Sequence, residues 1–162
     1  MDIQAERGQN LTERYIVFVP PTDIDRFHQL LVEQYERDTK NLQKFYKFST
    51  LIRLLKEGRF HLWIGGVHES FSDEVVPEFV MLACFQDYEL VRKYVILWVG
   101  GSNVYKYFHL FPVVEDFALH NGASVLTISG KISRLRLLEK AGFKTEVVYM
   151  DKQLRPEKKE LN

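Results

Sequence analysis

The sequence predicts a single α/β domain built on a mixed sheet, with its elements in the order β-α-α-β-β-β-α-β-α-β. Short apolar runs rich in β-branched residues, which favour strands, alternate with segments whose apolar residues recur at helical spacing. Three of these runs follow one another with short connections, which favours antiparallel neighbours. Two strand–helix units near the end favour parallel pairing. A chain of 162 residues, 46% of them hydrophobic, suffices for one well-buried core.

Composition narrows the classes of protein that the chain can represent. The 22 basic and 22 acidic residues cancel, which argues against a broad electrostatic surface for nucleic acid or anionic lipid. Cys84 is the only cysteine, which excludes an internal disulfide and a Cys-based zinc site. The first residues lack the apolar region of a secretion signal, and no apolar run is long enough to cross a bilayer. We therefore expect a cytoplasmic protein that binds neither nucleic acid nor membrane.

The first third of the chain predicts one strand and two helices. Residues 15–20 (YIVFVP) form an apolar run that ends in two prolines. Thr22 or Asp23 can cap the helix that follows, and Gly58 ends the second helix. The apolar faces comprise Ile24, Phe27, Leu30, Leu31 and Tyr35 in the first helix and Leu42, Phe45, Phe48, Ile52 and Leu55 in the second.

The middle of the chain predicts three neighbouring strands. They cover residues 60–69, 78–86 and 93–101, and residues 70–77 form a loop between the first two. Gly65 and Gly66 indicate a bulge or a turn within the first of them. The short connections predict an antiparallel meander.

The last third returns to alternating helices and strands. Residues 103–122 form a helix in which Pro112 either causes a kink or starts a new first turn. A strand at 124–129, a helix that Gly142 ends, and a strand at 144–154 complete the domain. The domain thus covers residues 15–154, between a polar arm of residues 1–14 and a charged tail of residues 155–162.

This order of elements, with the closing stretch GASVLTISGKISRLRLLEKAGFKTEVVYMDKQL, resembles the GNAT family of acyl-CoA N-acyltransferases. The resemblance implies that acetyl-CoA binds with its thioester along residues 94–99. It also implies that backbone N–H groups after this strand hold the pyrophosphate, at the positive end of a helix. In the family, a tyrosine near the end of the penultimate helix protonates the departing thiolate.

The functional residues of the family carry over poorly. The position that corresponds to the family's pyrophosphate-binding loop falls on GGSNVYK (residues 100–106). This stretch lacks the family's basic residue and its glycine spacing. In the later helix, Lys131 replaces an asparagine, Arg134 replaces an alanine and Leu138 replaces the acid tyrosine. The pattern indicates a degenerate member of the family. The cofactor contacts that the resemblance implies are Leu97, Val99, Gly100, Gly101, Ser102, Asn103, Val104 and Lys131.

An acyltransferase also needs a base for the incoming amine. Glu78 at the start of a strand, His68 and Glu69 near the end of another, and Glu89 in a turn are the candidates, and no spacing singles one out. The five histidines form no HExxH motif, so we expect no catalytic metal.

Two functions follow from these observations. The first is an acetyl-CoA-dependent N-acyltransferase with an eroded cofactor loop. The second is a catalytically inactive binding or structural protein of the same fold. Its helix GKISRLRLLEKAG is similar to that of small GNAT-like proteins of short-tailed bacteriophages, some of them virion-associated. The aromatic residues of YKYFHLF (105–111) either fill the core or form a surface for a protein partner or a second copy of the chain.

Overall fold

The computed structural model describes residues 13–38, 42–68, 75–128 and 135–145. The chain forms two compact units, residues 1–130 and residues 131–162. The first holds the sheet and the helices that cover it. The second holds one described helix.

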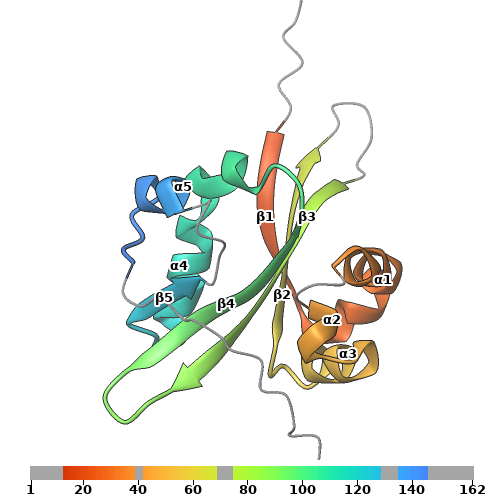
Figure 1. Ribbon diagram of the computed structural model, residues 1–162, viewed down its shortest axis with the longest axis horizontal. Helices are drawn as coiled ribbons and strands as arrows, with labels where there is room; N and C mark the ends of the chain where they lie inside the picture. The colour runs from red at the N-terminus through yellow and green to blue at the C-terminus, as the bar shows by residue number, and fades with distance from the viewer. Residues whose placement is uncertain (1–12, 39–41, 69–74, 129–134, 146–162) are drawn as a thin grey trace, which may run out of the picture. The chain divides into compact units, whose positions relative to one another are not determined.

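Five strands form one sheet in the order of the chain (Figure 1). The first four are antiparallel to their neighbours, and the fifth pairs in parallel with the fourth. The mixed sheet and the antiparallel meander are thereby confirmed, although the third strand starts inside the predicted loop 70–77. The strands are β1 (Glu13–Val19), β2 (His61–His68), β3 (Val75–Asp87), β4 (Arg92–Gly101) and β5 (Val125–Ile128).

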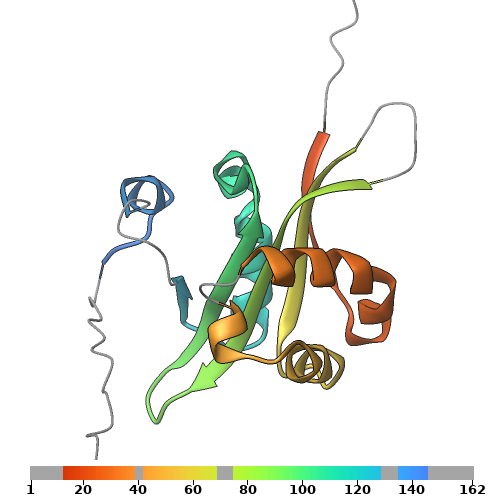
Figure 2. The same cartoon turned by 45° about the vertical axis from the view of Figure 1, so that its right-hand side comes forward.

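One face of the sheet is covered by helices from the first third of the chain. They are η1 (Pro21–Phe27), α1 (His28–Arg37), α2 (Leu42–Phe45) and α3 (Phe48–Lys56). Figure 2 shows α1 lying across the strands. The buried core on this face consists of Val19, Ile24, Leu31, Leu42, Leu51, Leu55, Leu62, Ile64, Val80, Leu82 and Trp98.

Two details of the predicted helices are wrong. The first helix begins as a 3-10 helix, and neither Thr22 nor Asp23 caps it with a side-chain hydrogen bond. The second predicted helix is two helices. They separate at Tyr46, because its carbonyl accepts a hydrogen bond of 2.7 Å from the Tyr35 hydroxyl. Phe45 therefore lies outside the apolar face and is 70% exposed.

The other face of the sheet is covered by η2 (Val104–Leu110) and α4 (Pro112–His120). Pro112 stands in the first turn of α4, where its missing N–H is harmless. This confirms the alternative in which Pro112 starts a new helix within residues 103–122.

The aromatic stretch at 105–111 mostly fills the core. Tyr107 and Phe111 are buried against the sheet together with Trp63 and Phe79, whereas Tyr105 is 52% exposed. The buried members therefore support the core interpretation, and only part of the stretch can meet a partner.

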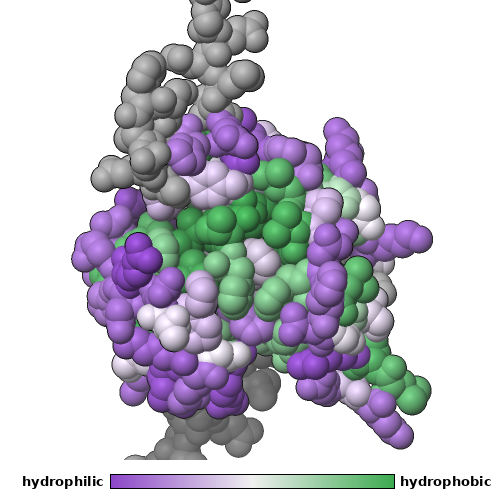
Figure 3. Space-filling view, turned by 180° about the vertical axis from the view of Figure 1, so that it is seen from behind, coloured by the Kyte–Doolittle hydropathy of each residue, from purple (hydrophilic) through white to green (hydrophobic). Residues whose placement is uncertain are grey.

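Seen from behind, hydrophobic residues gather in the middle of the surface and hydrophilic residues surround them (Figure 3). Single exposed hydrophobic side chains include Leu90 at the β3–β4 turn and Leu119 on α4. An extended apolar area of this kind is typical of a contact surface. None of the helices in the described ranges has the length and apolar character needed to cross a membrane.

The second unit contains α5 (Leu135–Lys140). Gly142 adopts a φ of +87°, and the N–H of Phe143 donates to the carbonyl of Leu138 at 3.1 Å. The predicted stop at Gly142 is thereby confirmed. The terminal arm and tail, most of the last predicted strand, Lys131 and Arg134 lie outside the described residues.

Candidate functional site

β4 contains one residue more than the stretch of β3 that it faces. Leu82 pairs with Trp98 and Ala83 pairs with Ile96, so Leu97 has no partner in β3 and forms a bulge. The extra residue changes which side chains share a face. Leu97 and Trp98 both pack on the face covered by α1, whereas Ile96 and Val99 pack on the face covered by α4.

The bulge is held by a contact with the end of α1. The indole Nε1 of Trp98 donates a hydrogen bond to the carboxylate of Asp38, the residue after α1. The same indole lies over Gly100, where a Cβ atom would come within 2.1 Å of the ring. Packing against Trp98 therefore requires a glycine at position 100.

The pairing between β4 and β5 stops next to the bulge. It joins residues 93–96 of β4 to residues 125–128 of β5. Beyond it, residues 97–101 of β4 have no β5 partner within the described ranges. Backbone N–H and C=O groups on such an edge need other partners. An extended ligand with amide groups is suited to supply them.

A second bulge lies in β3 at Glu78. Gly65 of β2 pairs with Phe79 and Gly66 pairs with Pro77, so Glu78 has no partner in β2. The bulge expected at Gly65 and Gly66 is thereby confirmed, with the extra residue on the facing strand. Gly65 is needed here because a Cβ would come within 1.9 Å of the Phe79 ring.

The last residues of β4, the connection and the first residue of η2, together called the β4–η2 loop (residues 100–104), contact Glu78. The Glu78 carbonyl accepts a hydrogen bond of 2.9 Å from the Ser102 N–H, and its carboxylate accepts one of 3.3 Å from Asn103 Nδ2. Gly101 has a φ of +109°, and a Cβ there would lie 2.4 Å from the Glu78 carbonyl oxygen. Only glycine fits a position that combines this φ with such a close backbone.

The carboxylate of Glu78 also anchors η2. The Tyr107 hydroxyl donates a hydrogen bond of 2.5 Å to it. Burial, and then the hydrogen bond and charge of Glu78, raise the pKa of Tyr107, whereas the positive charge of Arg14 lowers it. The phenol therefore stays neutral and remains a donor.

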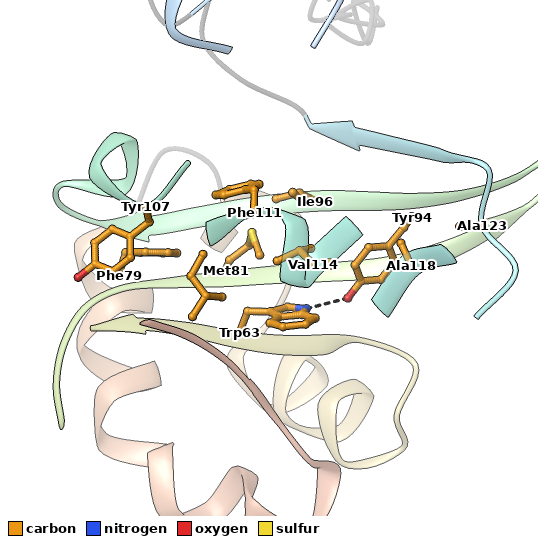
Figure 4. Close-up of a cluster of buried hydrophobic side chains, with 12 residues drawn as sticks. Trp63, Phe79, Met81, Tyr94, Ile96, Tyr107, Phe111, Val114, Ala118 and Ala123 are labelled. Carbon is orange, nitrogen blue, oxygen red and sulfur yellow. Dashed lines mark hydrogen bonds between the residues drawn. The ribbon is translucent and has the colours of Figure 1, made fainter. Parts of the chain in front are cut away.

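A separate polar group lies inside the core at the other end of the aromatic cluster (Figure 4). The Tyr94 hydroxyl accepts a hydrogen bond of 2.8 Å from Trp63 Nε1 and lies 3.0 Å from His61 Nδ1. Burial raises the pKa of Tyr94, so the phenol keeps its proton, and the direction of its hydrogen bond with His61 is set by the tautomer of that ring. Burial first, and then the charge of Arg92, lower the pKa of His61.

Sequence reasoning gave His61 no role. The spacing of His61 and Trp63 places both on one face of a strand. Tyr94 joins them only because β2, β3 and β4 pair in this register. The sequence alone carries no signal for that register.

The structure separates three of the candidate bases, and the fourth, Glu69, lies outside the described residues. Glu78 lies under the β4–η2 loop. His68 lies at the end of β2, with its ring 6.3 Å from the Tyr15 ring. Glu89 is exposed in the turn between β3 and β4, at the opposite end of β4 from Gly101.

The cofactor-contact residues expected on β4 and after it form one continuous stretch. Leu97, Val99, Gly100 and Gly101 lie in β4, Ser102 and Asn103 connect β4 to η2, and Val104 begins η2. Leu138 lies in α5 of the second unit. Within the described residues, no group of three or more His, Cys, Asp or Glu side chains could hold a metal ion.

Solved structures with the same fold include several acetyltransferases. An aminoglycoside acetyltransferase from an uncultured soil metagenomic sample matches with a TM-score of 0.60 and 15% identity, over 88% of this chain and 97% of that one. Glucosamine-6-phosphate N-acetyltransferase from Arabidopsis thaliana matches with a TM-score of 0.54 and 12% identity, over 88% and 99%. A transcriptional regulator from Bacillus halodurans C-125 matches with 0.58 and 16%, over 88% and 100%. The chain matches no family model and no curated protein.

The chain thus has the GNAT, or acyl-CoA N-acyltransferase, fold. The neighbours differ in their described roles. The fold alone therefore assigns no activity to this chain.

Proposed function

We propose that the chain is an N-acyltransferase that takes its acyl group from acetyl-CoA. The observation that carries this proposal is the bulge at Leu97, together with the end of the β4–β5 pairing at Ile96 and Ile128. Within the described residues, this arrangement leaves the edge of β4 beside the bulge without a strand partner, and an extended acyl-pantetheine arm can bind there.

The edge of β4 beyond Ile96 fits the pantetheine arm of such a donor. The backbone groups of Leu97 and Val99 would hold the pantetheine amides, and residues 100–104 would meet the diphosphate. Lys131, outside the described residues, belongs to the same proposal. Acetyl-CoA, when bound, supplies an acyl group activated as a thioester. The chain supplies the edge that orients it.

Proton transfer has no single evident residue. Among the candidate bases that the structure describes, Glu78 lies closest to the proposed cofactor site, but Asn103 and Tyr107 already occupy its carboxylate. His68 and Glu89 remain the other proposals for this role. Leu138 has no proton to donate, so water would protonate the departing thiolate.

A catalytically inactive binding protein is the second candidate. It is favoured by the leucine at position 138 and by the hydrophobic area in Figure 3. Its partner would be another protein or a second copy of the chain, and a virion-associated role is one form of this proposal. Light scattering after size-exclusion chromatography tests the second copy, and a monomer at all concentrations would contradict it.

Titration with acetyl-CoA tests the proposed enzyme. Specific binding should raise the melting temperature as the ligand exceeds its dissociation constant. The absence of any shift at millimolar acetyl-CoA would refute the acyltransferase proposal.

Ser102→Glu tests the location of the site. Ser102 is exposed, so a longer side chain meets no packing obstacle. A carboxylate beside two phosphate charges should weaken acetyl-CoA binding about tenfold. Ser102→Gln is the control of matched size and should leave the affinity unchanged. Equal affinities for the two variants would contradict this location.

A further inference from the structure

We propose that Glu78 is a specificity-determining residue for the acyl donor. Its carboxylate weakens the contribution of the diphosphate to binding, so that recognition depends mainly on the pantetheine arm. This inference rests on the proposed function, since it concerns the same site.

The geometry places the carboxylate directly against the β4–η2 loop. Glu78 is the extra residue of the β3 bulge, which turns it away from the regular pairing with β2. Its carboxylate contacts Asn103 of the loop and Tyr107 of η2. An anion that approaches the loop amides therefore also approaches the negative charge of the Glu78 carboxylate.

This charge is not neutralised by its partners. Asn103 is neutral, and the Tyr107 phenol keeps its proton. Glu78 takes part in none of the ion pairs among the described residues. Between Gly100 and Tyr105 the sequence contains no lysine or arginine. Arg14, whose guanidinium lies 6.0 Å from the centre of the Tyr107 ring, and Lys106, whose ammonium lies 5.9 Å from the centre of the Tyr105 ring, form no ion pair with Glu78. A carboxylate without a paired cation disfavours a diphosphate beside it.

The loop also has few amides to offer an anion. The N–H of Ser102 already donates to the Glu78 carbonyl. The helix that follows is a 3-10 helix of seven residues, whose dipole is correspondingly small. The local field of the loop therefore depends strongly on the one carboxylate.

Glu78→Gln separates charge from geometry. Glutamine keeps a carbonyl oxygen that can accept from Tyr107 or Asn103, and it removes the charge. The proposal predicts tighter binding of the diphosphate-bearing ligand. A residue that merely shaped the loop would give unchanged or weaker binding.

The test uses two probes, coenzyme A and pantetheine, because only the first carries the diphosphate. Calorimetry or NMR titration of the full chain gives both dissociation constants. Glu78→Gln should tighten coenzyme A binding about tenfold and leave pantetheine binding unchanged. The matched control is Glu36→Gln on α1, an exposed glutamate, which should change neither constant.

An unchanged or weakened affinity for coenzyme A in Glu78→Gln would overturn the proposal while leaving the acyltransferase proposal intact. If neither protein binds either probe, the proposed function is refuted and this inference falls with it. A salt titration of the unmodified chain applies even where Glu78→Gln fails to fold. Added salt screens the Glu78 carboxylate, so the affinity for coenzyme A should rise relative to the affinity for pantetheine. A relative weakening would count against the proposal.

Discussion

Replacing Tyr94 by phenylalanine removes one hydroxyl from the middle of the core and leaves the ring in place. In the unmodified chain this hydroxyl accepts a hydrogen bond from Trp63 Nε1 and pairs with His61 Nδ1. Tyr94 is 0% exposed and Trp63 is 1% exposed, so water cannot replace the lost partner of the indole.

The expected cost follows from this burial. A buried donor left without a partner costs about 1–3 kcal/mol, and Trp63 loses its only hydrogen-bond acceptor among the described residues. We therefore expect Tyr94→Phe to lower the free energy of unfolding by about 2 kcal/mol. For a chain of this size, that corresponds to a fall in melting temperature of about 4–8 °C.

Urea unfolding followed by tryptophan fluorescence measures this change, because Trp63 and Trp98 both belong to the first unit. Tyr88→Phe is the matched control. Tyr88 is 55% exposed and its hydroxyl donates a solvent-exposed hydrogen bond to Gln86, so removing it should change the free energy of unfolding negligibly. Equal losses for the two variants would refute the role assigned to the buried hydroxyl.

The remaining predictions concern the same first unit. Since burial holds the pKa of His61 below its ordinary value, the unfolded chain binds the proton more readily. The contribution of His61 should therefore not lower the free energy of unfolding above pH ~6.5, and the free energy should decrease as the pH falls below that value. Urea unfolding between pH 5 and 8 measures this decrease, which His61→Gln should make smaller. Gly101→Ala should lower the free energy of unfolding by more than about 3 kcal/mol, because a Cβ would collide with the Glu78 carbonyl, whereas Gly122→Ala should cost only about 1 kcal/mol. Both glycines have positive φ, so equal losses would show that the collision does not matter.

Local signals were enough to predict much of the fold. The alternation of apolar runs located β2, β3 and β4, and Pro112 marked the start of α4. The split at Tyr46 could not be predicted, because it depends on a hydroxyl eleven residues away in α1. Local propensity carries no information about such a tertiary contact.

The candidate site was predictable only in part. Counting along the resemblance placed the loop at residues 100–106, and in the structure Gly100 and Gly101 are the last residues of β4 and Val104 begins η2. The bulges at Leu97 and Glu78 depend on the register between strands, which is set by the packing of both faces. For the same reason, the contact of Glu78 with Asn103 and Tyr107 could not be read from spacing.

Chemical shift mapping of the backbone amides during an acetyl-CoA titration tests the central claim most directly. We expect saturable shifts for residues 97–104, on β4 beyond the bulge and in the β4–η2 loop, with little change in the β3–β4 turn at residues 88–91. Shifts confined to other elements, or none at millimolar acetyl-CoA, would contradict it.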